Sequence, residues 1–339
     1  MGKTTILDAL HYLSLGKSAI NPVDSANIAY HESAFHIKAK INRAGSPHEV
    51  LCAVQTGKKK SLQVNKKEYD RLSGHVGFMP VVMISPNDNN LINEGNEARR
   101  KFFDSTISQL DKPYLQNLVR YQKALKQRNA LLRQFGQNME VDPAQLAPYD
   151  HELLTLGEEI YRMRAKFLTG FIKRFNKFYK KLSNAHEVVA VAYASDWQQG
   201  NITNKFNQAI KRDLALQRTT VGIHRDVYHF TIAGKPIKRF GSQGQQKSLI
   251  VALKIAQFEA FRKATRLTPV LLLDDIFDKL DDERMGILLK MVGEHSFGQI
   301  FLTDARPERT RAMLAENKLS ARIFTVADGL ITNTEDYAP

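Results

Sequence analysis

The sequence predicts an α/β protein in which a mixed sheet flanked by helices is interrupted by an inserted helical domain. Three observations support this prediction. The chain opens with a glycine-lysine-threonine run at residues 2–5, which is typical of a phosphate-binding loop that leads into a helix. The apolar run 270–273 ends in two carboxylates, which is typical of a buried strand that ends at a ligand-binding edge. Between these segments, residues 96–217 carry long helical patterns and few strand signals.

The composition limits the classes of function. The 339 residues are 43% hydrophobic, which is ordinary for a globular protein with sizeable cores. The net charge of +14 favours a polyanionic partner, with nucleic acid ahead of an anionic membrane surface. No apolar run reaches transmembrane length, so we expect a cytoplasmic protein without a membrane partner. The single cysteine, Cys52, excludes an internal disulfide and fits a core position in a reducing compartment.

Residues 1–95 are expected to form the N-terminal part of the α/β lobe. Apolar positions at helical spacing predict the first helix, and alternating residues predict a hairpin. The expected elements are a helix over residues 2–15, strands over 35–41 and 49–54 joined by a turn at 45–47, a lysine-rich turn at 58–60, and a buried strand over 80–84.

Residues 96–217 form the predicted insertion, a helical arm. Leucines repeat at intervals of seven over 118–132, and phenylalanines recur at helical spacing over 167–178. Two long helices are therefore expected to pack as an antiparallel hairpin, with the proline-containing stretch 136–148 as the turn between them. We interpret these apolar stripes as packing faces rather than as a cofactor site.

Residues 218–339 return to alternating strand and helix signals and are expected to complete the α/β lobe. The expected elements are a strand over 227–232, a helix over 244–266, strands over 270–274 and 299–303, and a last strand near Ile323. No internal repeat is found in the sequence.

The opening motif indicates a nucleotide ligand. Lys3 is expected to place its ammonium on the β- and γ-phosphates and Thr4 to offer its hydroxyl to magnesium, with Gly2 and Thr5 completing the nucleotide-binding end of the helix. The motif alone is weak, since an ordinary capped helix explains it as well. A complete phosphate-binding loop has a strand and a further glycine upstream, so we expect Met1 to be an internal methionine of a longer reading frame.

Two carboxylates follow the apolar run 270–273. Asp274 is expected to hold Mg²⁺ directly or through water, and Asp275 to polarise an attacking water as the catalytic base. Adjacent carboxylates are costly without a cation, although strands also end in Asp at ordinary turns. ATPases with this strand motif usually carry a Glu at the second position, and Asp275 is one methylene shorter. The assignment of Asp275 as the base is therefore weaker than the assignment of Asp274 as a metal ligand.

A third motif, at residues 241–245, precedes a long apolar helix. Its hydroxyl and glycine N–H groups are expected to face an anion, which makes Ser242, Gly244 and Gln245 candidate nucleotide-binding residues. A cap that serves only the helix is the alternative. A Ser-x-Gly-Gln motif about thirty residues before a strand that ends in Asp-Asp is the order of an ABC-type ATPase.

Together these motifs resemble the RecF family of ATPases, which is related to SMC and Rad50 proteins. The implied fold is an ABC-type P-loop ATPase head with an inserted helical arm. The similarity is carried by residues 2–10, 85–88, 99–104, the signature 240–249, and the strand and D-loop 272–281. Residues 222–226 also fit a family pattern, but Val227 stands where a second aspartate is usual, which leaves the role of Asp226 open. A kinase catalytic loop with His-Arg-Asp is disfavoured because no Asp-Phe-Gly follows.

The resemblance implies ATP and Mg²⁺ as cofactors and an ATP-dependent homodimer. Nucleotide held by one copy is covered by Ser242 and Gly244 of the other, and weak DNA-stimulated ATPase activity is implied if the phosphate-binding loop is complete. Asp304 stands where many ABC ATPases carry a histidine, so the γ-phosphate switch is assigned to Thr303 or Asp304. The implied role is recombinational and replication-gap repair within the SOS response to DNA damage, with RecR and RecO as partners and RecA indirectly.

Charge placement predicts the DNA contacts. Residues 162–181 contain eight basic residues and no acidic residue, and helical spacing turns their aromatic residues inward. This predicts phosphate contacts to double-stranded DNA and to single-stranded gaps or junctions, with weak sequence preference. The candidate DNA-binding residues are Arg162, Arg164, Lys166, Lys173, Arg174, Lys177, Lys180 and Lys181. A solvated helix face is the alternative.

Two other functions stay open at this point. A DNA-binding scaffold without ATPase activity is the alternative if Met1 is the true start, and it predicts DNA binding without ATP affinity. The ATPase of a membrane transporter predicts a short helical subdomain, and the long basic arm argues against it.

Overall fold

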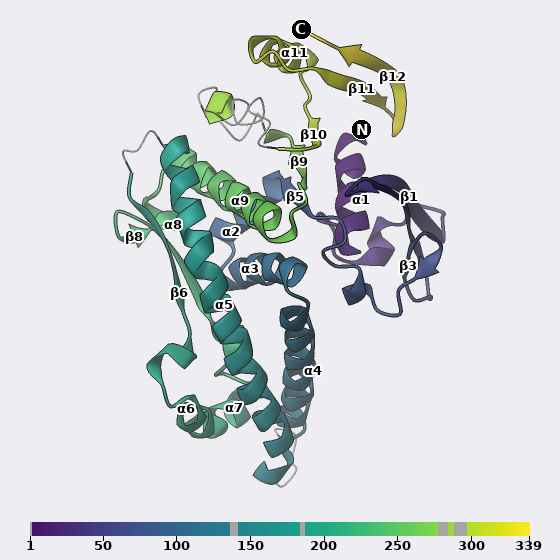
Figure 1. Ribbon diagram of the computed structural model, residues 1–339. Helices are drawn as coiled ribbons and strands as arrows, with labels where there is room; N and C mark the ends of the chain where they lie inside the picture. The colour runs from purple at the N-terminus through teal and green to yellow at the C-terminus, as the bar shows by residue number, and fades with distance from the viewer. Residues whose placement is uncertain (1, 136–141, 184–186, 277–283, 288–296) are drawn as a thin grey trace. The chain divides into compact units, whose positions relative to one another are not determined.

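The computed structural model describes residues 2–135, 142–183, 187–276, 284–287 and 297–339 (Figure 1). The chain forms two compact units. The first contains Met1–Asn89, Lys177–His186 and Ser242–Pro339, and the second contains Asn90–Asn176 and Glu187–Gly241. The D-loop expected at residues 277–281 lies outside the described residues.

A parallel sheet positions the motifs in the first unit. Its described strands are β5 (Val81–Ile84), β9 (Val270–Asp274) and β10 (Ile300–Thr303), in the order β10-β9-β5. All four residues of β5 are buried, as expected for an unbroken apolar strand in a parallel sheet. Helix α1 (Lys3–Leu15) contacts the three strands, and α9 (Gln243–Thr265) contacts β5.

An antiparallel sheet packs on α1 in the same unit. It consists of β1 (Ala34–Arg43), β2 (Ser46–Gln55), β3 (Ser61–Val64) and β4 (Lys67–Glu68). The predicted hairpin is confirmed, but its turn is Ala44–Gly45 rather than 45–47. Both turn residues have positive φ, 51° and 83°, which is the geometry that a two-residue hairpin turn requires. Leu7 and Cys52 are buried in the core that the sheet shares with α1.

The end of the chain forms a hairpin where one strand was predicted. Helix α11 (Pro307–Glu316) is followed by β11 (Ala321–Ala327) and β12 (Leu330–Tyr337). The two strands pair antiparallel around Asp328 and Gly329, both with positive φ. β12 was missed because polar residues interrupt its alternation.

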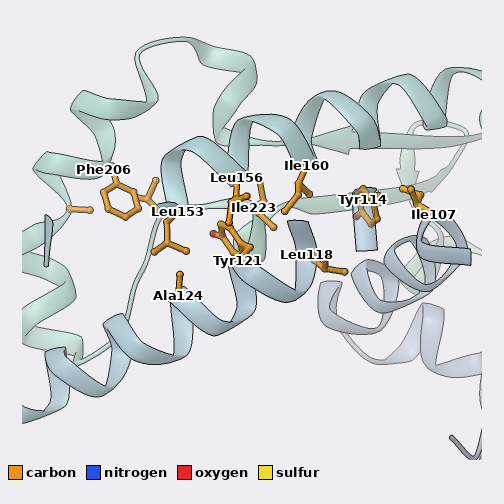
Figure 2. Close-up of a cluster of buried hydrophobic side chains, with 12 residues drawn as sticks. Ile107, Tyr114, Leu118, Tyr121, Ala124, Leu153, Leu156, Ile160, Phe206 and Ile223 are labelled. Carbon is orange, nitrogen blue, oxygen red and sulfur yellow. The ribbon is translucent and has the colours of Figure 1, made fainter. Parts of the chain in front are cut away.

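The second unit is built around a helical hairpin. Its helices are α2 (Asn90–Asn93), α3 (Asn96–Leu110), α4 (Lys112–Phe135), α5 (Ala147–Leu182), of which residues up to Asn176 belong to this unit, α6 (Ile202–Gln208), α7 (Ile210–Leu216) and α8 (Ile237–Phe240). Asn117 bonds Glu159 and Arg128 bonds Asp150, so α4 and α5 run antiparallel as predicted. Figure 2 shows the apolar core between them, which contains Tyr121 and Ile160.

The second unit differs from the predicted insertion 96–217. Strand β6 (Val189–Ala194) lies within the segment that was expected to be helical, and it pairs antiparallel with β7 (Val227–Ile232), which in turn pairs with β8 (Lys235–Pro236). The strand expected at 227–232 is present, but it belongs to the unit that contains the arm. Short alternating runs do not reveal their pairing partner, because pairing is a tertiary property.

Candidate nucleotide-binding site and basic arm

The carboxyl ends of β9 and β10 bring two motifs together. The strands are parallel and in register, with Thr303 opposite Asp274. The Thr303 hydroxyl donates to Asp274 Oδ1 at 2.8 Å and accepts from the Asp275 backbone N–H at 3.1 Å. Asp274 is 4% exposed and Thr303 is 9% exposed, so this network is buried. Thr303 therefore links both predicted acidic residues.

The start of α1 meets the same edge of the sheet. The Thr4 hydroxyl donates to Asp274 Oδ1 at 2.9 Å, and the Lys3 ammonium donates to the backbone oxygen of Asp304 at 2.8 Å. Gly2 precedes the helix with φ 112°, and a Cβ there would lie 3.1 Å from the Gly329 Cα. Only glycine fits this conformation and this approach without strain. The structure thus brings Thr4 to the Asp274 carboxylate and Lys3 to the backbone that follows β10.

Asp275 begins the turn after β9 in an unusual backbone conformation. Its φ is 49°, in the left-handed region that L-residues seldom adopt, and its N–H is held by Thr303. Such a conformation persists where the surroundings fix it, and it is frequent at functional sites. Its catalytic role as a base stays a prediction. Thr5, in the first turn of α1, is exposed.

The two switch candidates have different surroundings. The Asp304 carboxylate accepts hydrogen bonds from the side chains of Arg309, at 2.9 Å, and Thr310, at 2.8 Å, both of which lie in the first turns of α11. Burial opposes its ionisation, but these donors hold the pKa of Asp304 below its usual value. Thr303 instead contacts the predicted metal ligand directly. The geometry therefore favours Thr303 over Asp304 as the switch residue.

The donor set fits a magnesium nucleotide. A hydroxyl and a carboxylate oxygen lie 2.9 Å apart beside a helix N-terminus and an ammonium group. Mg²⁺ in such sites takes one or two protein oxygens and completes its shell with phosphates and water. Among the described residues no group of three or more His, Cys, Asp or Glu gathers as an all-protein metal site. When bound, the ion would neutralise phosphate charge that develops during transfer.

The signature residues form a separate group at the start of α9. Ser242 is the N-cap: its hydroxyl accepts from the Gln245 N–H at 3.2 Å, and the Gln245 side chain accepts from the Ser242 N–H at 2.7 Å. Gln245 therefore takes part in the helix cap, as the alternative interpretation of this motif expects. Ser242 is exposed and its O–H proton stays available to donate. Gly244 lies beside Arg284, whose guanidinium is 3.3 Å from the position of an added Cβ.

Lys254 was missed by the sequence analysis. Its ammonium pairs with Asp88 at 2.5 Å and donates to the Met83 backbone oxygen at 2.8 Å. Asp88 also accepts from the Ser85 N–H at 2.8 Å. The segment after β5 is therefore fixed to α9 by a partly buried ion pair. A lone lysine within an apolar helix was the only sequence signal.

The basic arm contains one clear correction. Arg164, predicted to bind DNA, is 1% exposed and pairs with Asp104 at 2.8 Å and with Asp226 at 2.7 Å. It also donates to the Ile223 backbone oxygen at 2.9 Å. Arg164 is thus a core residue, because acids from distant segments neutralise it. This also gives Asp226, whose role was open, a structural function.

The other predicted DNA contacts have different exposure. Arg162 pairs with Glu158 on the helix surface, and Arg174 is half-buried. The exposed lysines of α5 are Lys166, Lys173, Lys177, Lys180 and Lys181. The structure therefore leaves a row of lysines on α5 that can reach a polyanion. Within the described part of the chain, no helix combines the length and the apolar character that crossing a bilayer requires.

Comparison with known proteins identifies relatives over the whole chain. No family model matches the sequence. The chain is 43% identical over 326 residues to the DNA replication and repair protein RecF of Flavobacterium johnsoniae, covering 96% of this chain and 91% of that protein. It is 42% identical over 340 residues to RecF of Phocaeicola vulgatus, covering 100% of this chain and 91% of that protein.

Solved structures agree with these relatives. A structure of the recombination mediator protein RecF with ATP, in the RecFOR pathway, matches with a TM-score of 0.87 and 26% identity over 99% of this chain and 89% of that one. An Smc head domain from Pyrococcus furiosus matches with a TM-score of 0.52 and 14% identity over 98% of this chain and 86% of that one. The second likeness shows that the fold is that of an SMC-type ATPase head, as the sequence predicted.

Proposed function

The chain belongs to the RecF family of DNA replication and repair proteins, and from that premise we propose that it is an ATP-dependent DNA-binding protein of recombinational and replication-gap repair. The observation that carries the proposal is the three-way contact in which Thr4 and Thr303 both bond Asp274 Oδ1. It joins the start of α1 to the ends of β9 and β10 at one sheet edge, where α/β proteins bind nucleotides.

Each residue of this edge has a role that its chemistry supports. Lys3 and the N–H groups at the start of α1 would hold the phosphates, with Gly2 and Thr5 at the same helix end. Thr4 and Asp274 would hold Mg²⁺ through oxygen ligands. Asp275 would accept a proton from the attacking water, and Thr303 would hold the Asp274 carboxylate and the Asp275 backbone in position through its two hydrogen bonds.

We infer that the nucleotide is covered by two copies of the chain. Ser242 is exposed at the positive end of α9 and its hydroxyl can donate, as expected for a group that covers the γ-phosphate of a second copy. We therefore infer an ATP-dependent homodimer, with weak ATPase activity that DNA stimulates. Transition-state charge on the γ-phosphate needs donors from both sides, so a single copy would hydrolyse slowly.

The DNA side of the proposal rests on the lysines of α5. Their ammonium groups are exposed along one helix, and Arg164 is excluded because it is buried. Contacts of this kind neutralise phosphates without reading bases. The solved relative is described as a mediator of the RecFOR pathway. We propose that this chain, in the cytoplasm, likewise acts at gapped or junction DNA with RecR and RecO, and helps RecA indirectly.

Nucleotide binding by the full chain tests the proposal. Fluorescence titration with a labelled ATP analogue in Mg²⁺ buffer should give saturable binding that Lys3→Ala weakens by about 10-fold or more. Lys66→Ala, which removes an exposed lysine from the β3–β4 turn, is the matched control and should bind like the parent chain. Retained DNA binding with no measurable affinity for ATP would instead support the scaffold function.

A further inference from the structure

The antiparallel sheet of the first unit carries a row of basic side chains outside the nucleotide site. β1, which Figure 1 labels, is the edge strand of this sheet. Its residues alternate between exposed and half-buried positions. His36, Lys38 and Lys40 all occupy exposed positions, so they lie on the same face. Alternate residues of a strand are separated by about 7 Å. An extended polyanion with regularly spaced charges is complementary to such a row.

A groove lies at one end of this row. It has a volume of about 310 Å³ and is lined by the start of β1, the end of β2 and the turn that leads to β3. Lys58 and Lys59 contribute exposed ammonium groups, and His36 contributes an exposed ring. Ala34 and Ala53 contribute small apolar side chains. The groove therefore combines positive charge with a surface that is large enough for a planar ring.

The turn that carries the two lysines is held in place. The Thr56 N–H donates to the Ser33 oxygen at 3.0 Å, and the Lys58 N–H donates to the Gln55 oxygen at 3.1 Å. Gly57 has φ 74°, which this tight turn requires. The lysine backbones are thus fixed before any ligand arrives, which lowers the entropy cost of binding.

Few acidic groups compensate this charge. Glu49 pairs with Lys38 at 2.9 Å, and Glu32 lies in the turn before β1. Lys59 donates to the Asp70 backbone oxygen at 3.1 Å, which leaves its charge uncompensated. Within the described residues, neither Lys40 nor Lys58 forms an ion pair. The face therefore keeps a net positive charge.

We propose that this basic groove binds single-stranded DNA, with a phosphate on Lys58 and Lys59, a base against the His36 ring, and the next phosphates along β1. The proposal rests on the DNA-binding function proposed above and adds a second contact surface for the unpaired strand. A single strand exposes its bases for stacking on aromatic side chains, whereas a duplex hides them. The groove thus suits the unpaired part of gapped DNA, and the lysines of α5 suit the duplex.

Fluorescence anisotropy with labelled oligo-dT tests this assignment. The double variant Lys58→Ala/Lys59→Ala should bind about 10-fold more weakly at low salt, and the slope of log affinity against log salt should fall by about 0.7, because the phosphate that the two lysines share is lost. Lys66→Ala/Lys67→Ala removes two exposed lysines from the β3–β4 hairpin of the same sheet and should change little. His36→Ala should weaken binding without changing the slope.

Duplex DNA separates this proposal from the general DNA-binding function. Lys58→Ala/Lys59→Ala should leave blunt-duplex affinity within about twofold, and Lys173→Ala/Lys177→Ala on α5 should lower it. Equal losses of oligo-dT affinity in the two double-lysine variants of the sheet would overturn the groove while leaving the DNA-binding function intact. Unchanged oligo-dT binding together with lost binding of a polyglutamate peptide would also overturn it, and would assign the groove to an acidic peptide.

Discussion

Replacing Arg164 by methionine should destabilise the second unit strongly. The guanidinium bonds Asp104 through two nitrogens, at 2.8 and 3.1 Å, and Asp226 through the third, at 2.7 Å. Methionine fills much of the space but leaves two carboxylates without their cation. Removing one partner of a buried ion pair costs about 3–5 kcal/mol, because the remaining charge stays desolvated.

Urea denaturation followed by circular dichroism measures this cost. The matched control is Arg162→Met, two residues away on α5, which breaks an exposed pair with Glu158. Exposed i,i+4 pairs contribute about 0.3–0.5 kcal/mol, so the control should unfold close to the parent chain. In the absence of urea and at low temperature, where the Arg164→Met variant is folded, it should keep the DNA affinity of the parent chain. Parent-like stability combined with a selective loss of DNA affinity would refute the structural role.

Three further predictions concern the nucleotide, the dimer and pH. Asp275→Asn should slow ATP hydrolysis by about 10²-fold or more and prolong the ATP-bound dimer, as measured by phosphate release and light scattering. Ser242→Arg should prevent ATP-dependent dimerisation in sizing chromatography and spare ATP binding by the monomer; an unchanged dimer would reject this. Burial lowers the pKa of His224 to about 4, below its ordinary value of 6.5. The unfolded chain therefore binds the extra proton first, so stability should fall by about 3 kcal/mol between pH 6.5 and 4, and His224→Asn should reduce this fall.

The elements that meet at the carboxyl ends of β9 and β10 were predictable because each of their motifs is local. The run at residues 2–5 predicted a helix start, and the apolar run 270–273 predicted a strand that ends in Asp274. Parallel strands then bring their carboxyl ends to one edge, so the meeting of Thr4 with Asp274 follows from topology. Ser242 as the N-cap of α9 was predictable for the same reason, because capping depends on neighbouring residues.

The buried charges were not predictable from local patterns. Arg164 lies in a run of basic residues, and its partners are 60 and 62 positions away in the sequence. The number of charged residues within one helix does not reveal which acidic residues of other elements the fold places beside it. The sequence did not predict the pairing of β6 with β7 for the same reason, because strand pairing depends on tertiary contacts. The role of Lys254 was missed for a similar reason, because the residues of the second unit separate it from Asp88 in the sequence.

The dependence of ATP affinity on Mg²⁺ tests the central claim most directly, because Thr4 and Asp274 are assigned to the metal. Isothermal titration of ATP should show that the parent chain binds more tightly with Mg²⁺ than with EDTA, and that Thr4→Val and Asp274→Asn each abolish this difference. Thr169→Val, an exposed position on α5, should keep it. A full Mg²⁺ dependence in Thr4→Val and Asp274→Asn would contradict the assignment of the nucleotide to this edge.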